Sequence, residues 1–143
     1  MRMTPRGLHA ESARDAQCHD PSKRLILRAW CLLVYIEFVM QTGSLGAVHR
    51  FVRKQDVRPK TAQQVAELCH AVDLASVFYF KRVPCLQRSV VTTLLLRRHG
   101  WNAEMVIGVR MLPFQSHAWV EIQGRIVNDK PYLLEIYRAL DRC

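Results

Sequence analysis

The sequence predicts an α+β fold in which a group of helices comes first and a small antiparallel β-sheet follows. Two patterns indicate this order. As far as His99 the apolar residues recur at helical spacing, and from Ala103 they form short runs that alternate with polar residues. Half of the 143 residues are hydrophobic and 23% are charged, which is typical of a globular domain with its own core.

We expect a single domain over residues 21–143, preceded by a flexible tail at residues 1–20. The tail lacks the apolar run of a secretory signal. Within the domain, residues 21–80 are expected to form a helical part, and residues 83–137 the core that carries the candidate site.

The first helix is expected to begin near Pro21 or Ser22, with Asp20 or Ser22 as its N-cap, and to end at about Gln41. Its segment AWCLLVYIEFVM, residues 29–40, is apolar, but it is too short to cross a bilayer and contains a glutamate. We therefore expect a buried helix and no stable membrane insertion, with docking at an interface or on a partner left open.

Further helices are expected before the sheet. The segment LGAVHRFVRK should add one or two helical turns. Pro59 and Thr61 are expected to open a second long helix, TAQQVAELCHAVDLASVFYF, with Thr61 as its N-cap. A third helix should begin at about Cys85 and be closed by Gly100, because glycine suits the left-handed conformation that ends many helices.

The strands are expected at AEMVIGVR, HAWVEIQ and RIVND, and the tail PYLLEIYRAL is either a short strand or a short helix. In the second strand, alternation puts His117, Trp119 and Glu121 on one face and the even-numbered residues on the other.

The chain has a formal net charge of +9, from 21 Lys and Arg against 12 Asp and Glu. The arginines are spread along the whole chain, which favours attraction to acidic partners but predicts no nucleic-acid partner. No zinc-binding spacing and no phosphate-binding loop is present, so we expect no metal and no cofactor. The five cysteines are odd in number and far apart, which indicates reduced thiols in the cytoplasm.

One cysteine differs from the others in its position. Cys85 follows Pro84 at the start of the third predicted helix, where unpaired N–H groups and the positive end of the helix dipole favour the anionic sulfur. Arg82 and Arg88 act in the same direction, and the anion is the nucleophilic form. For the remaining cysteines we expect the common role of small buried residues; they are Cys18, Cys31, Cys69 and Cys143.

A nucleophilic thiol needs a base, and the base needs a group that orients it. His117 is the best candidate base, and Asp129 follows it across a predicted turn. A two-residue turn, Gln123 and Gly124, would point Asp129 away from the histidine. A three-residue loop that ends in a bulge at Arg125 would place both side chains on one face, and we favour this register.

The order of thiol, histidine and carboxylate is that of papain-like and transglutaminase-like thiol enzymes. The stretch CLQRSVVTTLLLRRHGWNAEMVIGVRMLPFQSHAWVEIQGRIVND resembles the transglutaminase-like B2 family of lasso peptide biosynthesis proteins. In that family a C-L-x-R-S/A helix start, L-L-R-R-x-G, I-G-V-R and H-A-W-V-E with a downstream N-D occur together. The resemblance covers residues 83–137, with a looser fit of the helices before them.

The resemblance implies a cysteine leader peptidase, which cuts a ribosomally made lasso precursor peptide through an acyl-enzyme. In this family pattern Cys85 is the nucleophile, His117 is the general base and then acid, and Asp129 orients His117. Gln87 is a candidate second oxyanion donor beside the Cys85 N–H. Trp119 could contact substrate or stack on the site, with Glu121 paired to an arginine such as Arg88 or Arg110.

The resemblance also implies partners. Some family members carry a fused leader-recognition domain, for which we expect no room here, so a separate leader-recognition protein should present the precursor. A separate ATP-dependent lasso cyclase would then close the core peptide. Two alternatives stay open: a catalytically silent module that binds the precursor or a partner, and a transglutaminase-like acyltransferase that transfers the acyl group to an amine.

Overall fold

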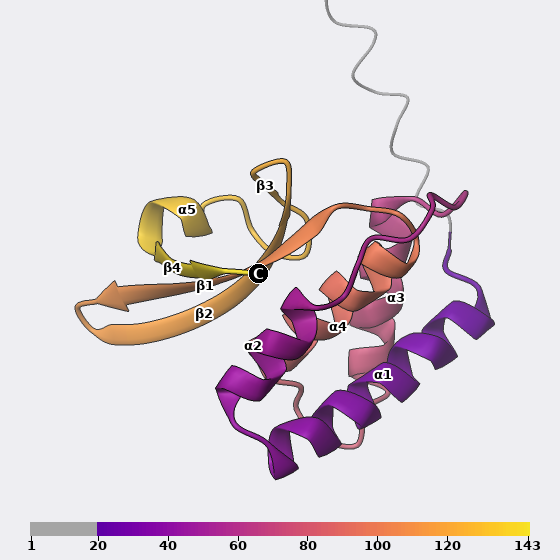
Figure 1. Ribbon diagram of the computed structural model, residues 1–143, viewed down its shortest axis with the longest axis horizontal. Helices are drawn as coiled ribbons and strands as arrows, with labels where there is room; N and C mark the ends of the chain where they lie inside the picture. Colours follow the sequence, from indigo (N-terminus) through magenta and orange to yellow (C-terminus); the bar gives the residue numbers. More distant parts are fainter. Residues whose placement is uncertain (1–19) are drawn as a thin grey trace, which may run out of the picture.

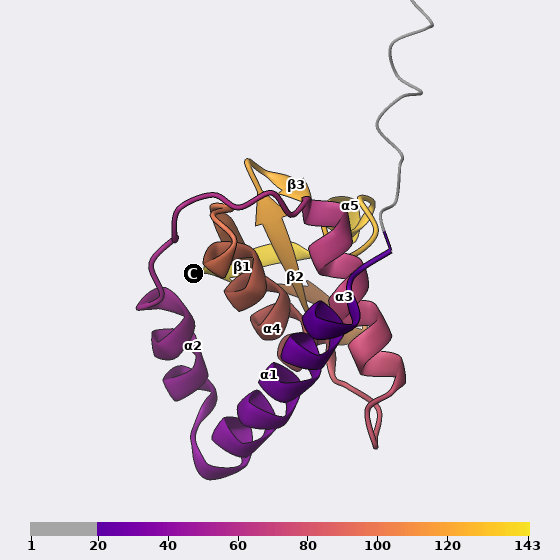
Figure 2. The ribbon, with the colours of Figure 1, turned by 90° about the vertical axis from the view of Figure 1, so that its right-hand side faces the viewer.

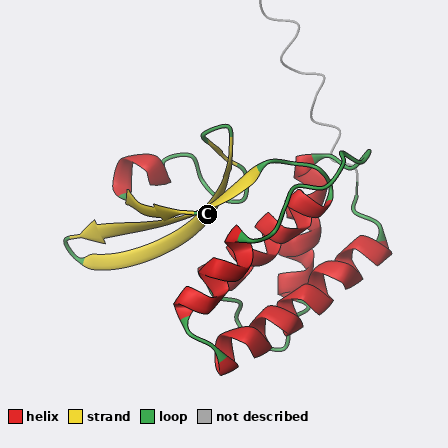
Figure 3. Ribbon diagram, in the orientation of Figure 1, coloured by secondary structure: helices red, strands yellow, loops and turns green. Residues whose placement is uncertain are grey.

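The computed structural model describes residues 20–143, apart from the side chain of Leu45, so the expected N-terminal tail lies almost wholly outside the described residues. Helices come first and a sheet follows, which confirms the predicted α+β class (Figure 1 and Figure 3). In chain order the elements are α1 (Lys23–Thr42), α2 (Leu45–Arg53), α3 (Val65–Val77), α4 (Cys85–Arg98), β1 (Ala103–Met111), β2 (Phe114–Ile122), β3 (Arg125–Ile126), α5 (Leu133–Ile136) and β4 (Arg138–Arg142).

Helix α1 begins where a serine side chain caps it. Ser22 Oγ accepts a hydrogen bond from the backbone N–H of Leu25 at 3.3 Å, so Ser22 is the N-cap. By length and composition alone α1 could cross a membrane, with a mean hydropathy of 1.5. One side of the helix nevertheless packs against α3 and α4 in the main core of the domain, through Leu25, Ala29, Leu32, Leu33 and Ile36.

Helix α3 starts at Val65, later than the sequence predicts, and the expectation that Thr61 is its N-cap is wrong. Thr61 lies against the C-terminal end of α4 instead. Its N–H donates to the carbonyl oxygen of His99 at 3.1 Å, and its hydroxyl is hydrogen-bonded to His99 Nδ1 at 2.9 Å. A helix end leaves carbonyl groups without partners, and satisfying one of them here outweighs the local preference of residues 61–64 for a helix.

Helix α4 lies between the other helices and the sheet (Figure 2). It packs against α1, α2 and α3 on one side and against β1 and β2 on the other, so most of its residues are buried. Near its end the buried guanidinium of Arg97 donates to the carbonyl oxygens of Ala103 at 2.8 Å and Val52 at 2.6 Å, which joins α4 to β1 and α2. The chain then leaves the helix at Gly100, whose φ of 87° is the left-handed conformation that the sequence predicts.

The sheet is antiparallel, with the strand order β3-β2-β1-β4. Strands β1 and β2 form a long hairpin, whereas β3 pairs with the last residues of β2 only. The C-terminal segment forms a helix and then a strand, α5 and β4. One face of the sheet packs on the helices through Met105 and Val120, and the other face carries a small second core of Val106, Trp119 and Leu133.

The close packing of Gly108 under Trp119 gives a test of this second core. A Cβ atom at Gly108 would stand 2.4 Å from Trp119 Cη2, and the tryptophan is fully buried. We expect Gly108→Ala to lower the free energy of unfolding by about 1–3 kcal/mol in urea denaturation, because the ring has no space to move.

The matched control is Gly46→Ala in α2, where the nearest atom to the new Cβ lies 3.6 Å away. This change should be neutral or stabilise by up to about 1 kcal/mol, because alanine favours helix more than glycine does. A Gly108→Ala protein as stable as the wild type would contradict the packing described.

Candidate active site

Cys85 is the first residue of α4, and the N-cap before it is Pro84, which makes no side-chain capping hydrogen bond. The first-turn N–H groups and the positive end of the helix dipole therefore lie beside a partly exposed thiol. By contrast, burial raises the pKa of Cys69 to about 12 and that of Cys143 to about 11, so both remain thiols at neutral pH. Cys31 is exposed on α1, and Cys18 lies outside the described residues.

His117 of β2 and Asp129 are in contact, with 2.8 Å between Nε2 and Oδ2. The same oxygen accepts a hydrogen bond from Arg88 Nη2 at 3.1 Å, and Oδ1 accepts one from the N–H of Lys130 at 2.8 Å. Burial opposes ionisation of Asp129, but the bonds from His117 and Lys130 and the charge of Arg88 together hold the pKa of this carboxyl below its ordinary value. An ionised carboxylate only accepts, so Nε2 of His117 carries a proton and Nδ1 is the ring nitrogen left for another partner.

This contact forms through a different register from the one we favoured. Ile122 of β2 pairs with Arg125 of β3, so the turn consists of Gln123 and Gly124 alone. Both turn residues have positive φ, 51° and 75°, which is typical of a tight two-residue hairpin turn. The three-residue loop that ends in a bulge is therefore wrong, and Asp129 needs another way to reach the histidine.

That way is a bend after β3, at residues 127–129. The side chain of Asn128 turns back to β2, where its Oδ1 accepts a hydrogen bond from the N–H of Val120 at 2.7 Å. Its Nδ2 donates to the Ser89 hydroxyl of α4 at 3.3 Å. Asn128 thus takes the place of a strand partner for β2, ties the bend to α4, and leaves Asp129 beside the edge of β2.

Arg88 of α4 holds the same bend. Its Nη2 donates to the carbonyl oxygen of Asn128 at 3.2 Å as well as to Asp129. Glu121 does pair with an arginine, as expected, but its partner is Arg142 at 2.6 Å and not Arg88 or Arg110. The sequence alone predicts no positioning role for Asn128 or Arg88, although both belong to the motifs on which the family resemblance rests.

Strand alternation puts His117 on the face of Trp119, away from α4. Beside His117, however, β2 has no outer neighbour within the described part of the chain, because β3 covers only the end of that strand. Across this open edge the imidazole borders the same hollow as Cys85, which measures about 570 Å³ and is also lined by Arg82, Val83, Pro84 and Arg88. Within residues 20–143 the hydrogen bond of the imidazole is to Asp129 and none joins it to the thiol, a contact that in enzymes often tightens only with substrate.

A second hollow opens at Cys85 and His117 on the side of the β1–β2 hairpin. It measures about 270 Å³, and its walls are mostly apolar: Leu86, Ile107, Val109, Phe114, Ser116, Ala118 and Leu140. The thiol and the imidazole thus border two hollows, one lined by Arg82 and Arg88 and one with mostly apolar walls.

Two residues of the predicted site, Gln87 and Trp119, are buried and line neither hollow. Gln87 is fully buried and donates to the carbonyl oxygen of Leu33 in α1 at 2.9 Å, so it is part of the helix packing and does not line either hollow. Trp119 is also fully buried, where its ring lies behind His117 and its Nε1 donates to Glu121 at 2.7 Å. A side chain with no exposed surface has no contact with a substrate, so the structure argues against Gln87 as an oxyanion donor and against substrate contact by Trp119. The alternative expectation, that Trp119 stacks on the site, agrees with its position against the His117 ring.

Comparisons with known proteins show the family of the chain. The family described as the transglutaminase-like superfamily matches residues 32–142. The chain is 38% identical over 61 residues to the microcin J25-processing protein McjB of Escherichia coli, a match that covers 41% of this chain and 29% of McjB. The chain therefore matches less than a third of this relative's length, and no solved structure gives a significant match. These findings support the resemblance to B2 proteins, and the chain belongs to the transglutaminase-like superfamily.

Proposed function

We propose that this protein is a cysteine leader peptidase that cleaves the leader from a ribosomally made lasso precursor peptide. The observation that carries the proposal is the 2.8 Å contact between His117 and Asp129 beside a hollow that Cys85 also lines. Membership of the transglutaminase-like superfamily and the partial match to McjB, a processing protein by name, support the same chemistry.

In the proposed mechanism, Nδ1 of His117 takes the proton of the Cys85 thiol, and the sulfur attacks the carbonyl carbon of the scissile peptide bond. The backbone N–H of Cys85 stabilises the resulting oxyanion. His117 then returns the proton to the leaving amine, which becomes the N-terminus of the core peptide. Water, deprotonated by His117, attacks the thioester that remains on the leader, and Cys85 is released as a thiol with the leader carboxylate. Asp129 keeps Nε2 protonated throughout, so Nδ1 is available for each transfer.

The proposal includes partners and a location. A separate leader-recognition protein would deliver the precursor, and an ATP-dependent cyclase would join the new amine to a side-chain carboxylate of the core. All of these steps would take place in the cytoplasm, where the described cysteines stay reduced, as their free state in the structure allows.

A second candidate is acyl transfer to an amine, which the superfamily description favours as much as hydrolysis. It would use the same thiol and imidazole but replace the attacking water with an amine. The products separate the two: a free leader carboxylate for the peptidase, and an amide-linked adduct for the transferase.

The direct test is a reconstitution with the precursor peptide encoded beside this protein and its recognition protein, followed by mass spectrometry. We expect the wild type to release the leader, and Cys85→Ala and His117→Ala to lose cleavage by at least about a thousandfold, because each removes a group that moves a proton or forms a bond. The peptidase proposal fails if Cys85→Ala is as active as the wild type.

A second prediction concerns the carboxylate. We expect Asp129→Asn to keep the fold, as judged by circular dichroism, and to slow cleavage by roughly three to four orders of magnitude, because the amide no longer fixes the ring tautomer. The matched control is Asp141→Asn, an exposed carboxylate of β4 outside both hollows, which should cleave at the wild-type rate. A loss of less than about tenfold in Asp129→Asn would mean that another group orients His117.

The apolar hollow predicts a substrate preference beside the cleaved bond. Leu140 lines this hollow and is 69% exposed, so Leu140→Glu should leave the fold intact while placing a charge in the hollow. We expect the KM of the precursor to rise about fivefold or more with kcat little changed, because an apolar substrate side chain loses its binding surface. Leu134→Glu, in α5 and 49% exposed, is the matched control, and an equal effect of both changes would refute the assignment.

A further inference from the structure

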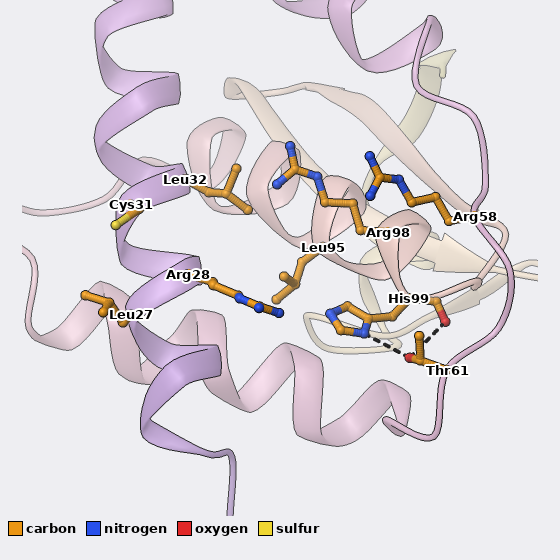
Figure 4. Close-up of a pocket in the computed structure, with 9 residues that line it drawn as sticks. All are labelled: Leu27, Arg28, Cys31, Leu32, Arg58, Thr61, Leu95, Arg98 and His99. Atoms are coloured by element: carbon orange, nitrogen blue, oxygen red, sulfur yellow. Dashed lines mark hydrogen bonds between the residues drawn. The ribbon is translucent and has the colours of Figure 1, made fainter.

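A third hollow lies at the other end of α4 from Cys85, and the proposed chemistry does not use it. It measures about 800 Å³ and lies between α1, the end of α4 and the segment before α3. Figure 4 shows its nine lining residues, which are Leu27, Arg28, Cys31, Leu32, Arg58, Thr61, Leu95, Arg98 and His99. We call it the arginine groove.

Three guanidinium groups surround this groove: Arg28 from α1, Arg98 from α4 and Arg58 from the connecting segment. All three residues are exposed, and among residues 20–143 no carboxylate forms an ion pair with any of them. Like charges gathered around one hollow repel one another, so an anion placed between them would be bound favourably.

The groove is already formed without a ligand. The backbone N–H of Arg58 donates to the carbonyl oxygen of Arg97 at 2.9 Å, and Thr61 is hydrogen-bonded to His99 as described above. Burial, and then the charge of Arg28, lower the pKa of His99, so its ring is neutral at neutral pH and the positive charge of the groove comes from the arginines. Because these hydrogen bonds already fix the backbone of the wall, binding of a ligand costs little conformational entropy there.

The remaining walls are apolar. Leu32 and Leu95 are buried and lie behind the arginines, and Leu27 is 61% exposed at the opening. A hollow of this size holds a short peptide segment or a small ligand. Guanidinium groups bind carboxylates through paired hydrogen bonds, and leucine walls bind apolar side chains. This mixture fits an acidic peptide with apolar residues better than a phosphodiester chain, which carries charge at every unit.

We propose that the arginine groove binds an acidic, partly apolar segment of the peptide substrate, at a distance from the bond that is cut; this inference rests on the proposed peptidase function. Cys85 and Arg98 are the first and last residues of α4. At 1.5 Å per residue they lie about 20 Å apart, a distance equal to about six residues of extended peptide. Because α4 is buried between the other helices and the sheet, a substrate strand passes around these neighbours and needs more than about six residues to reach from the groove to the thiol.

Binding is tested in the Cys85→Ala protein, so that cleavage plays no part. The probe is a fluorescent eight-residue peptide in which glutamate and leucine alternate, and its counterpart with glutamine in place of glutamate is the control. We expect the acidic peptide alone to raise the anisotropy, with an affinity that falls as salt is added. Arg28→Gln and Arg98→Gln should each weaken binding about fivefold or more, because each removes a charged hydrogen-bond donor.

Arg24→Gln is the matched control, since Arg24 is an exposed arginine of the same helix that does not line the groove. With this change added, the Cys85→Ala protein should bind the acidic peptide as tightly as before. The alkylation of Cys31 by iodoacetamide shows whether the peptide binds in the groove, because Cys31 is exposed and lines it. Bound acidic peptide should slow this alkylation severalfold. Arg28→Gln and Arg98→Gln should also raise the KM of the full precursor with kcat unchanged, while a short substrate without the acidic segment is cut as before.

The inference is overturned if the glutamine peptide binds equally, if the arginine changes leave binding unaltered, or if Cys31 is not protected. It is also overturned if a single-stranded oligonucleotide binds the groove in preference to the peptide, or if the arginine changes act only by altering self-association in sedimentation. Failure of the peptidase proposal gives a different result. In that case the Cys85→Ala protein would still cleave the precursor, whether or not the acidic peptide binds in the anisotropy experiment.

Discussion

The burial of α4 between two layers is the constraint on which the site depends. This helix carries the thiol at its first residue, and about one turn further on Arg88 and Ser89 reach the sheet side. Because the helix packs on α1 and α3 as well, its end is fixed relative to both layers. The two hollows beside Cys85 follow from this placement, since the helix start meets the sheet where the edge of β2 is open.

The carboxylate of Asp129 is held beside β2 by electrostatic interactions. Asp129 is half-buried, and a carboxylate in that position is stable only with partners that compensate for lost water. Arg88, the N–H of Lys130 and the imidazole of His117 supply them. Arg88 stabilises the charge of the Asp129 carboxylate and also holds the bend that brings this carboxylate to β2. The same side chain therefore supports both the position and the ionisation of Asp129. Asn128 completes the arrangement by satisfying the N–H of Val120 where the strand pairing stops.

Local patterns in the sequence predict much of this fold, because they depend on neighbours along the chain. The serine cap of α1, the start of α4 and the turn from helix to strand after Gly100 are all correct. One error is local, the length of the turn at Gln123 and Gly124. The others concern residues whose partners are distant. Thr61 is a good helix cap by type but satisfies the end of α4, and Asp129 reaches its partner through a bend that side chains of α4 hold. Neither contact, of Thr61 with the end of α4 or of Asp129 with His117, can be predicted from a strand register, because both depend on how α4 packs.

The central claim is that the imidazole of His117 acts on the sulfur of Cys85. It is tested most directly by the alkylation rate of each cysteine at pH 7 with a peptide chloromethyl ketone, which occupies the place of the substrate, followed by peptide mass mapping. The account predicts that Cys85 reacts at least about tenfold faster in the wild type than in His117→Ala, while the rate at Cys31 stays the same. Equal rates at Cys85 in the two proteins would contradict the account.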